Sequence, residues 1–454
     1  MPISRPIFCA KYIFAAAGMA FVCGCQTTSS LSSAASSDIE EAHNPLFSER
    51  SRPLHPEMKI TRENWLLPEN IRWGLRNARE IVPTSTIPNA LVASPLFSGT
   101  PIQDRELSIK TPDGQNFGMA QYLAENHVDG LLVMHEGKII YERYLNGMRP
   151  RDVHSWASMS KSMVGLIAVQ LAQQGRIDLD APLAAYVPEL RDSPFGQASV
   201  QQNMDMQLAL AYPQALPPDI GMFAAAGLLP ARSGMPDSIH GFLKVPQATE
   251  PPANGIFYYQ NGSTEAVAWA LQRVTGRSLS DLVRDMVWQP MGAQDQAYYP
   301  LDAAGSEFAS GGLHSTLRDA ARFGELIRNQ GRAQGRQVVA RPAIERILAT
   351  PSAANQARVR QSGRAMPSGT GYADFWWHPI QARGAVIASG RFGQRILVDP
   401  AHALTIVQFG TYPDTRARPA TAGQAITRQD NVLRTDDGLV ALAQAVSRHL
   451  RAAR

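Results

Sequence analysis

Apolar and polar residues alternate in a way that predicts a β-hairpin after residue 129. The segment Gly130-Leu-Leu-Val-Met-His-Glu-Gly-Lys-Ile-Ile-Tyr-Glu-Arg-Tyr has two β-rich runs on either side of Glu136-Gly137. Such runs joined by a glycine-containing turn are typical of antiparallel strands. A helix is expected next, because apolar residues recur at intervals of three and four between Ser158 and Gln173, and Gly175 can end it.

The remainder of the chain continues this mixed pattern. Helical spacing recurs at 264–274, 280–287, 316–328 and 439–450, and β-rich runs separated by short turns occupy 385–389, 395–398 and 404–409. Strands at both ends with helices between them predict an α+β domain. We expect an antiparallel sheet flanked by helices, with a helical insertion that interrupts the sheet, over residues 121–454.

The first 120 residues differ from this pattern and divide into three parts. Residues 1–24 contain Arg5 and Lys11 followed by an apolar run too short for a mature transmembrane helix, which indicates an export signal. Residues 25–42 are rich in serine and poor in bulky apolar groups, so they predict a flexible tether. Residues 43–120, rich in proline and short apolar pieces, are expected to form an irregular N-terminal extension packed on the main domain.

The cysteines are confined to this N-terminal region. Cys9, Cys23 and Cys25 are the three cysteines of the chain, so the predicted domain has no thiol for a disulfide or a thiolate metal site. The segment Val22-Cys23-Gly24-Cys25 resembles the bacterial lipobox, which implies that Cys25 is acylated and anchors the protein to a lipid bilayer. Gln26 implies the periplasmic face of the outer membrane. The alternative is a cleaved soluble signal with incidental cysteines.

Composition excludes several classes of function. The 44% hydrophobic and 18% charged residues are those of an ordinary folded protein, and a net charge of +4 does not predict a nucleic-acid partner. The ten histidines are scattered, without a His-x-His or His-Glu-x-x-His pattern, so we expect neither a metal nor another cofactor. A Gly-x-Ser-x-Gly elbow, which a Ser-His-Asp hydrolase usually shows, is also missing from the sequence.

A serine and a lysine are spaced for nucleophilic chemistry. Lys161 is the one lysine of six that has a serine three residues earlier, Ser158. At a helix start, residues three apart share a face, so the amine can lie beside the hydroxyl and take its proton if burial lowers the pKa of the lysine. The helix N-terminus favours a developing oxyanion. The alternative is a capped surface helix with a solvated lysine.

The neighbours of this pair carry a family resemblance. Trp156-Ala-Ser-Met-Ser-Lys-Ser-Met-Val-Gly is similar to the active-site helix of the β-lactamase-like, penicillin-recognising serine hydrolases. Gly255-Ile-Phe-Tyr-Tyr-Gln-Asn-Gly-Ser-Thr resembles the Tyr-x-Asn segment of that superfamily, which implies Tyr259 as a proton relay and Asn261 as its helper. Tyr258 is the competing tyrosine. The 6-aminohexanoate-dimer hydrolase-like branch has Tyr-x-Ser-x-Asn-Thr, and this chain exchanges the Ser and Asn.

The resemblance implies a third element at Ala388-Ser-Gly-Arg-Phe-Gly-Gln, where β-lactamases have Lys-Thr-Gly on a strand edge. It implies that Ser389 and Gly390 line the substrate site and that the N–H groups of Ser158 and Arg391 form the oxyanion hole. Alanine replaces the lysine at 388, which removes the charge that holds a substrate carboxylate. We expect the Arg391 side chain to be solvated, as is usual on a hairpin turn.

Three further matches, Gln289-Pro-Met-Gly, the segment 311–324 and Tyr372-Ala-Asp-Phe-Trp-Trp, resemble the same branch and are assigned to the fold. We expect Trp376 and Trp377 to pack in the core, and the alternative is that one of them borders the substrate pocket. The resemblance implies a serine hydrolase that cleaves small-molecule esters or linear amides through an acyl-enzyme on Ser158. Two alternatives stay open: a D,D-peptidase or β-lactamase, and a catalytically silent envelope binding lipoprotein. The segment 202–210, which departs from the family pattern, favours altered substrate walls.

Overall fold

The computed structural model describes residues 59–453, apart from 113, 214–217, 232, 249–255, 363–369, 380–381, 383 and 413–431. All of these described residues belong to one compact unit, Ser48–Arg454. The predicted export signal at 1–24 and the tether at 25–42, which includes Cys25, lie outside the described residues. They therefore stay predictions.

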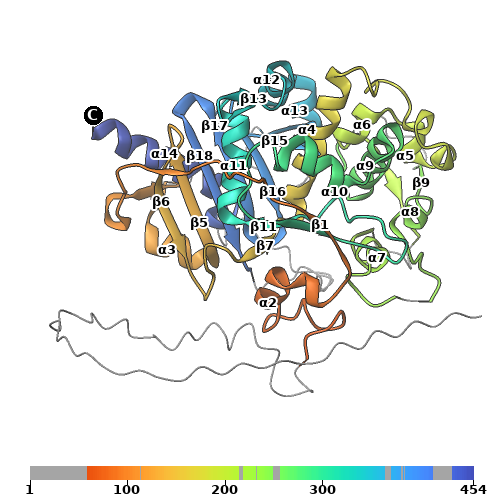
Figure 1. Cartoon of the computed structure of the whole chain (residues 1–454), viewed down its shortest axis with the longest axis horizontal. Helices are drawn as coiled ribbons and strands as arrows, with labels where there is room; N and C mark the ends of the chain where they lie inside the picture. Colours follow the sequence, from red (N-terminus) through yellow and green to blue (C-terminus); the bar gives the residue numbers. More distant parts are fainter. Residues whose placement is uncertain are drawn as a thin grey trace, which may run out of the picture. The chain divides into compact units, whose positions relative to one another are not determined.

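The centre of the described structure is an eight-stranded sheet (Figure 1). In spatial order its strands are β14 (Gly371–Ala373), β15 (Trp376–His378), β16 (Val386–Gly390), β17 (Gln394–Asp399), β18 (Leu404–Gly410), β5 (Val128–His135), β6 (Lys138–Tyr144) and β2 (Phe97–Ser98). All neighbours are antiparallel except the edge pair of β2 and β6. The predicted hairpin is confirmed, with Glu136 and Gly137 at positive φ in its turn.

Two helices cover opposite faces of this sheet. Gly324 of α11 (Leu317–Arg328) lies against Ile396 on β17, where a Cβ on the glycine would come within 3.2 Å of the isoleucine methyl group. The neighbouring residue on β17, Arg395, donates to Asp436 at the start of α14 (Asp436–Ala452). Because successive side chains of a strand point to opposite faces, α11 and α14 enclose the sheet between them. This arrangement confirms the predicted α+β class.

The chain between β7 and β10 forms the helical insertion. It begins with α4 (Ser160–Gln173) and continues through α5 (Pro194–Gln197), α6 (Val200–Met204), α7 (Pro218–Ala225), α8 (Ile239–Phe242), α9 (Gly262–Thr275) and α10 (Leu279–Val283). These helices gather on one side of the sheet (Figure 1). The remaining helices are α2 (Ile71–Arg76), α3 (Met119–Glu125), α12 (Arg341–Leu348) and α13 (Ala353–Gln361).

A smaller sheet of four antiparallel strands joins the N-terminal residues to this insertion. Its order is β1 (Thr84–Ile87), β10 (Ala297–Pro300), β11 (His314–Thr316) and β7 (Val153–Ser155). Since β1 belongs to this sheet and β2 to the large one, the described part of the N-terminal extension supplies strands to both sheets. The remaining strands form three short pairs: β3 (Ser108–Lys110) with β4 (Asn116–Gly118), β8 (Leu210–Ala211) with β9 (Gln247–Ala248), and β12 (Arg332–Ala333) with β13 (Arg336–Gln337).

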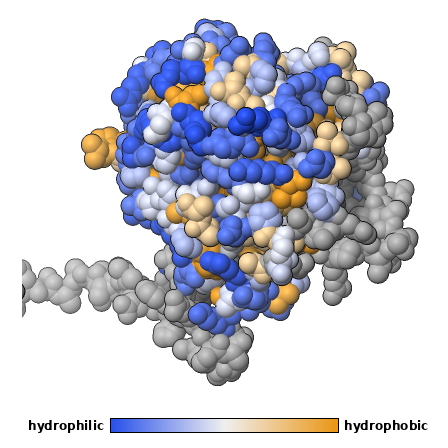
Figure 2. Space-filling view, turned by 90° about the vertical axis from the view of Figure 1, so that its right-hand side faces the viewer, coloured by the Kyte–Doolittle hydropathy of each residue, from blue (hydrophilic) through white to orange (hydrophobic). Residues whose placement is uncertain are grey.

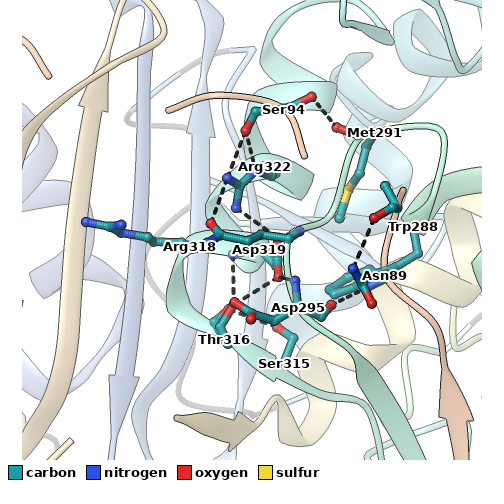
Figure 3. Close-up of polar contacts among 12 residues, drawn as sticks. Asn89, Ser94, Trp288, Met291, Asp295, Ser315, Thr316, Arg318, Asp319 and Arg322 are labelled. Atoms are coloured by element: carbon teal, nitrogen blue, oxygen red, sulfur yellow. Dashed lines mark hydrogen bonds and ion pairs between the residues drawn. The ribbon is translucent and has the colours of Figure 1, made fainter. Parts of the chain in front are cut away.

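A buried arginine of α11, paired with an aspartate of the same helix, ties the N-terminal extension to the body (Figure 3). Asp319 of α11 accepts from the guanidinium of Arg322 at 2.9 Å, and both side chains are almost fully buried. Arg322 in turn donates to the carbonyl of Ser94, whose hydroxyl donates to the carbonyl of Met291. Asp319 and Arg322 lie in the segment 311–324, and Met291 lies in Gln289-Pro-Met-Gly. These residues therefore serve the fold, as the sequence predicted, whereas Gly311, Gly312 and His314 at the start of the first segment line a cavity.

One face of the described structure is mainly polar. Figure 2 shows one face on which hydrophilic residues predominate and apolar residues occur in small separate groups. None of the described helices has the length and apolar character needed to cross a membrane.

Candidate active site

Ser158 lies in a short 3-10 turn, Ala157–Met159, that leads from β7 into α4. The preceding Ala157 has a φ of +44°, a conformation that costs a residue with a side chain some strain. Two hydrogen bonds hold this backbone: Ala157 N–H donates to Ser155, and the Ser160 hydroxyl donates to the Ala157 carbonyl. The turn presents Ser158, half-buried, to a cavity of about 550 Å³.

Lys161 is buried beside this serine and contacts three oxygen atoms. Its Nζ lies 3.0 Å from Ser158 Oγ, 2.8 Å from Asn261 Oδ1 and 2.8 Å from the carbonyl oxygen of Ser310. Burial lowers the pKa of the Lys161 ammonium, whereas Tyr259 and Glu265 act to raise it. The structure therefore brings Ser158, Lys161 and Asn261 together, and Asn261 contacts the lysine directly.

Tyr259 lies in the loop before α9 and also lines the cavity. Its ring stacks on Trp377, with centroids 5.5 Å apart, and meets the edge of Tyr372. The Lys161 ammonium lies 5.1 Å from the centroid of the Tyr259 ring. Tyr258, the competing tyrosine, is not among the residues that line the cavity. Trp377 borders the cavity while remaining buried.

The end of β16 closes another side of the cavity at Ser389, Gly390 and Arg391. A Cβ on Gly390 would lie 2.5 Å from the carbonyl oxygen of Trp156 and 3.1 Å from the amide nitrogen of Ser158. Only a glycine lets the strand approach the serine turn this closely. The Ser389 hydroxyl donates to Asp436, so its proton already has an acceptor within the protein.

The Arg391 side chain differs from the sequence expectation of a solvated arginine. Its guanidinium lies 3.8 Å from the carboxylate of Asp219, both residues line the cavity, and about one third of the arginine side chain is exposed. The difference arises because α7 brings Asp219 across the cavity from the hairpin turn. Ala388 is buried and contributes no charge at the lysine position of the β-lactamases.

Sequence reasoning missed several groups that line or support this cavity. They are Trp65, Leu75, Asp219, Phe308, Tyr412 and Asp436 on its walls, together with Glu265 beneath it. Trp65 and Leu75 come from the N-terminal extension, and the Trp65 indole donates to the carbonyl of Leu228. No short motif marks these residues. Each is many positions away from Ser158 in the sequence, so only the fold shows that it lies near the serine. Within the described part of the chain, no three His, Cys, Asp or Glu side chains gather as metal ligands would.

Known proteins resemble this chain over most of its length. The Beta-lactamase family model matches residues 118–429. A 6-aminohexanoate-dimer hydrolase of Paenarthrobacter ureafaciens is 30% identical over 364 residues, which are 79% of this chain and 90% of that protein.

Solved structures agree with this likeness. A candidate 6-aminohexanoate-dimer hydrolase from Bacillus anthracis superimposes with a TM-score of 0.75 at 28% identity, covering 87% of this chain and 97% of that one. A family VIII carboxylesterase shares the fold, with a TM-score of 0.52 at 17% identity over 73% of this chain and 95% of the other.

Proposed function

The chain belongs to the Beta-lactamase family and is a serine hydrolase, and from this premise we propose that Ser158 is its nucleophile and Lys161 the base that activates it. Tyr259 and Asn261 complete the proton-handling group. The substrate is a small ester or linear amide, cleaved through an acyl-enzyme.

The set of contacts around Lys161 is the observation that carries this proposal. A neutral amine has two N–H groups and one lone pair. When its N–H groups donate to Asn261 Oδ1 and the Ser310 carbonyl, the lone pair is directed at the Ser158 hydroxyl, 3.0 Å away. Burial favours the neutral form that this geometry needs.

In the first step Ser158 Oγ attacks the substrate carbonyl carbon while its proton passes to Lys161 Nζ. The oxyanion that forms is stabilised by the N–H groups of Ser158 and Arg391, a role supported by the close approach of Gly390 to the serine turn. Tyr259 relays the proton to the leaving alcohol or amine, and the carbonyl–leaving-group bond breaks. Water then attacks the acyl-enzyme and gives a proton to Lys161, and this proton returns to Ser158 Oγ as the ester bond to the serine breaks and the free acid departs.

The substrate class is inferred from position 388, where β-lactamases have a lysine that holds the substrate carboxylate and this chain has an alanine. Ala388 has no charge, and the guanidinium of Arg391 lies 3.8 Å from the carboxylate of Asp219, which is largely exposed and partly offsets its charge. This favours esters and linear amides over penicillins and D-Ala-D-Ala peptides. The named activities of the Paenarthrobacter hydrolase and of the carboxylesterase are consistent with this choice. A D,D-peptidase or β-lactamase is the second candidate, and Arg391 is the residue that supports it.

Fluorophosphonate labelling followed by mass spectrometry tests the nucleophile. We expect the label on Ser158, and Ser158→Ala should lose at least about a thousandfold in hydrolysis of activated esters while remaining folded. Ser162→Ala is the matched control, because that hydroxyl donates to the Phe375 carbonyl away from the lysine. Full activity in Ser158→Ala would refute Ser158 as the nucleophile, whereas a parent protein with neither label nor hydrolysis would favour the silent binding lipoprotein.

A substrate panel separates the two candidate activities. It compares p-nitrophenyl esters, aminohexanoate-type linear amides, nitrocefin and a D-Ala-D-Ala peptide. We expect turnover of the first two classes and at best slow turnover of the others. Efficient cleavage of nitrocefin or the peptide with negligible esterase activity would establish the second candidate instead.

The cellular location is proposed from the sequence. We infer that Cys25 is acylated and holds the enzyme at the bacterial cell envelope, on the periplasmic face of the outer membrane. Cys25→Ser should release the protein from the membrane fraction. Equal membrane association of the variant and the parent would rule out this anchor.

A further inference from the structure

The buried carboxylate of Glu265 is connected to the proposed base, Lys161, through the backbone of residues 309–310. Glu265 lies in the first turn of α9 and is 3% exposed. Its two carboxylate oxygens accept from the N–H groups of Ala309 and Ser310, at 3.1 and 2.7 Å. The carbonyl of the same Ser310 accepts from Lys161 at 2.8 Å.

Helix α9 thus contributes to the lysine site twice. Asn261, at its start, contacts Lys161 directly, and Glu265, one turn later, contacts the backbone that holds the lysine's other N–H acceptor. Two charge-assisted hydrogen bonds to consecutive amides leave this backbone little freedom to rotate. A displacement of the Ser310 carbonyl oxygen by about 0.5 Å would turn the lone pair of Lys161 away from Ser158.

We propose that Glu265 is a positioning residue: it fixes the Ser310 carbonyl that orients Lys161, and its buried negative charge determines the pH at which Lys161 becomes a base. This inference rests on the proposed function, since it concerns the base of that same site. The charged and titratable groups that act on Lys161 are Glu265, Tyr259 and Asp219, and those near Glu265 are Lys161 and Tyr299.

The sign of the effect follows from the charges. An ionised Glu265 stabilises the Lys161 ammonium and so raises the pKa of the lysine. Burial raises the pKa of Glu265 itself to about 7, against the hydrogen bonds it accepts from Ser310 and Ala309. Replacing the carboxylate by a neutral amide removes the stabilisation of the ammonium. The neutral lysine then forms at lower pH, and the acid limb of kcat/KM moves to lower pH.

The experiment compares pH profiles of kcat/KM for a neutral p-nitrophenyl ester. In Glu265→Gln we expect the acid limb to move down by about one pH unit and the plateau of kcat to fall about tenfold. Glu265→Asp keeps the negative charge, but its side chain is one methylene shorter and holds the Ser310 backbone less well. The plateau of kcat should therefore fall, while the acid limb of kcat/KM stays at the parental pH. A parental plateau in Glu265→Asp would overturn the positioning role even if Glu265→Gln fails to fold.

Glu307→Gln is the matched control. Glu307 is also a buried carboxylate, accepting from Ser280 N–H at 3.0 Å and from the Gln272 amide at 2.9 Å, but it is not among the groups that act on Lys161. A merely structural effect would appear equally in both glutamine variants. An unmoved acid limb in Glu265→Gln, or an equal shift in Glu307→Gln, would overturn the inference alone. If the parent enzyme shows no acid limb in its kcat/KM profile, or if fluorophosphonate labels a residue other than Ser158, the proposed function is wrong and this inference is wrong with it.

Discussion

Substitution of Gly390 by alanine tests how closely the strand edge must approach the nucleophile. The added Cβ would lie 2.5 Å from the Trp156 carbonyl oxygen and 3.1 Å from the Ser158 amide nitrogen. Since both of these atoms belong to backbone, the clash cannot be relieved by rotating a side chain. The end of β16 must move by several tenths of an ångström, and the Arg391 N–H must move with it.

The expected loss follows from the role of that N–H group. Oxyanion donors act only within a narrow range of distance, and removing one commonly costs about 10²- to 10³-fold in kcat, or about 3–4 kcal/mol. We therefore expect Gly390→Ala to lower kcat for a p-nitrophenyl ester by about a hundredfold. KM should change little, because the substitution affects the transition state more than ground-state binding.

A control and a refuting result complete this test. Gly118→Ala is the matched control, because Gly118 has an ordinary φ of −79° and open space around its missing side chain. Thermal unfolding should show that both variants stay folded. If folded Gly390→Ala keeps the parental kcat, the end of β16 does not position an oxyanion donor. The assignment of the Arg391 N–H to the oxyanion hole would then be wrong.

Other substitutions test separate parts of the site and the fold. Lys161→Ala and Tyr259→Phe should each lower the rate of ester hydrolysis, and the loss of rate in the double variant should be far smaller than the product of the two single losses. Independent effects in this double-mutant cycle would contradict a shared proton relay. Asp319→Asn should lower the free energy of unfolding by about 3–5 kcal/mol, measured with denaturant, because it leaves the Arg322 guanidinium buried without its partner; a change below about 0.5 kcal/mol would contradict this. Asp219→Asn should raise about fivefold the ratio of kcat/KM for carboxylate-bearing over neutral esters, since it frees Arg391 from its counter-ion; an unchanged ratio would show that the arginine does not face the substrate.

The proposals about the catalytic residues depend on features that lie close together in the sequence. Ser158 and Lys161 are three residues apart at a helix start, and the structure brings their side chains to 3.0 Å. Tyr259 and Asn261 were identified by a local motif, and both line the cavity. The pairing of Ser158 with Lys161 could be predicted because helix geometry relates residues three apart in the same way in every protein, whereas the placement of Tyr259 and Asn261 was implied by the family resemblance.

The resemblance also anticipated that 388–391 would come near the serine, more than two hundred residues away. It did not anticipate the partner of Arg391. The arginine was expected in solvent because hairpin turns are usually exposed, and only the position of α7 shows that Asp219 lies opposite. Likewise, the described N-terminal residues carry no motif, yet Trp65 and Leu75 form part of the cavity wall.

Periodicity, together with residues within one helical turn, was enough to predict the hairpin after residue 129, the helix after Ser158, the mixed α+β class and the pairing of Ser158 with Lys161. The distant groups that surround this pair could be identified only from the folded structure. The Ser310 carbonyl is a backbone atom that every residue has, so its contact with Lys161 leaves no mark in the sequence. Glu265 is one acidic residue among 39 until the fold places it under that backbone. Long-range contacts of this kind arise from packing, which depends on the whole chain.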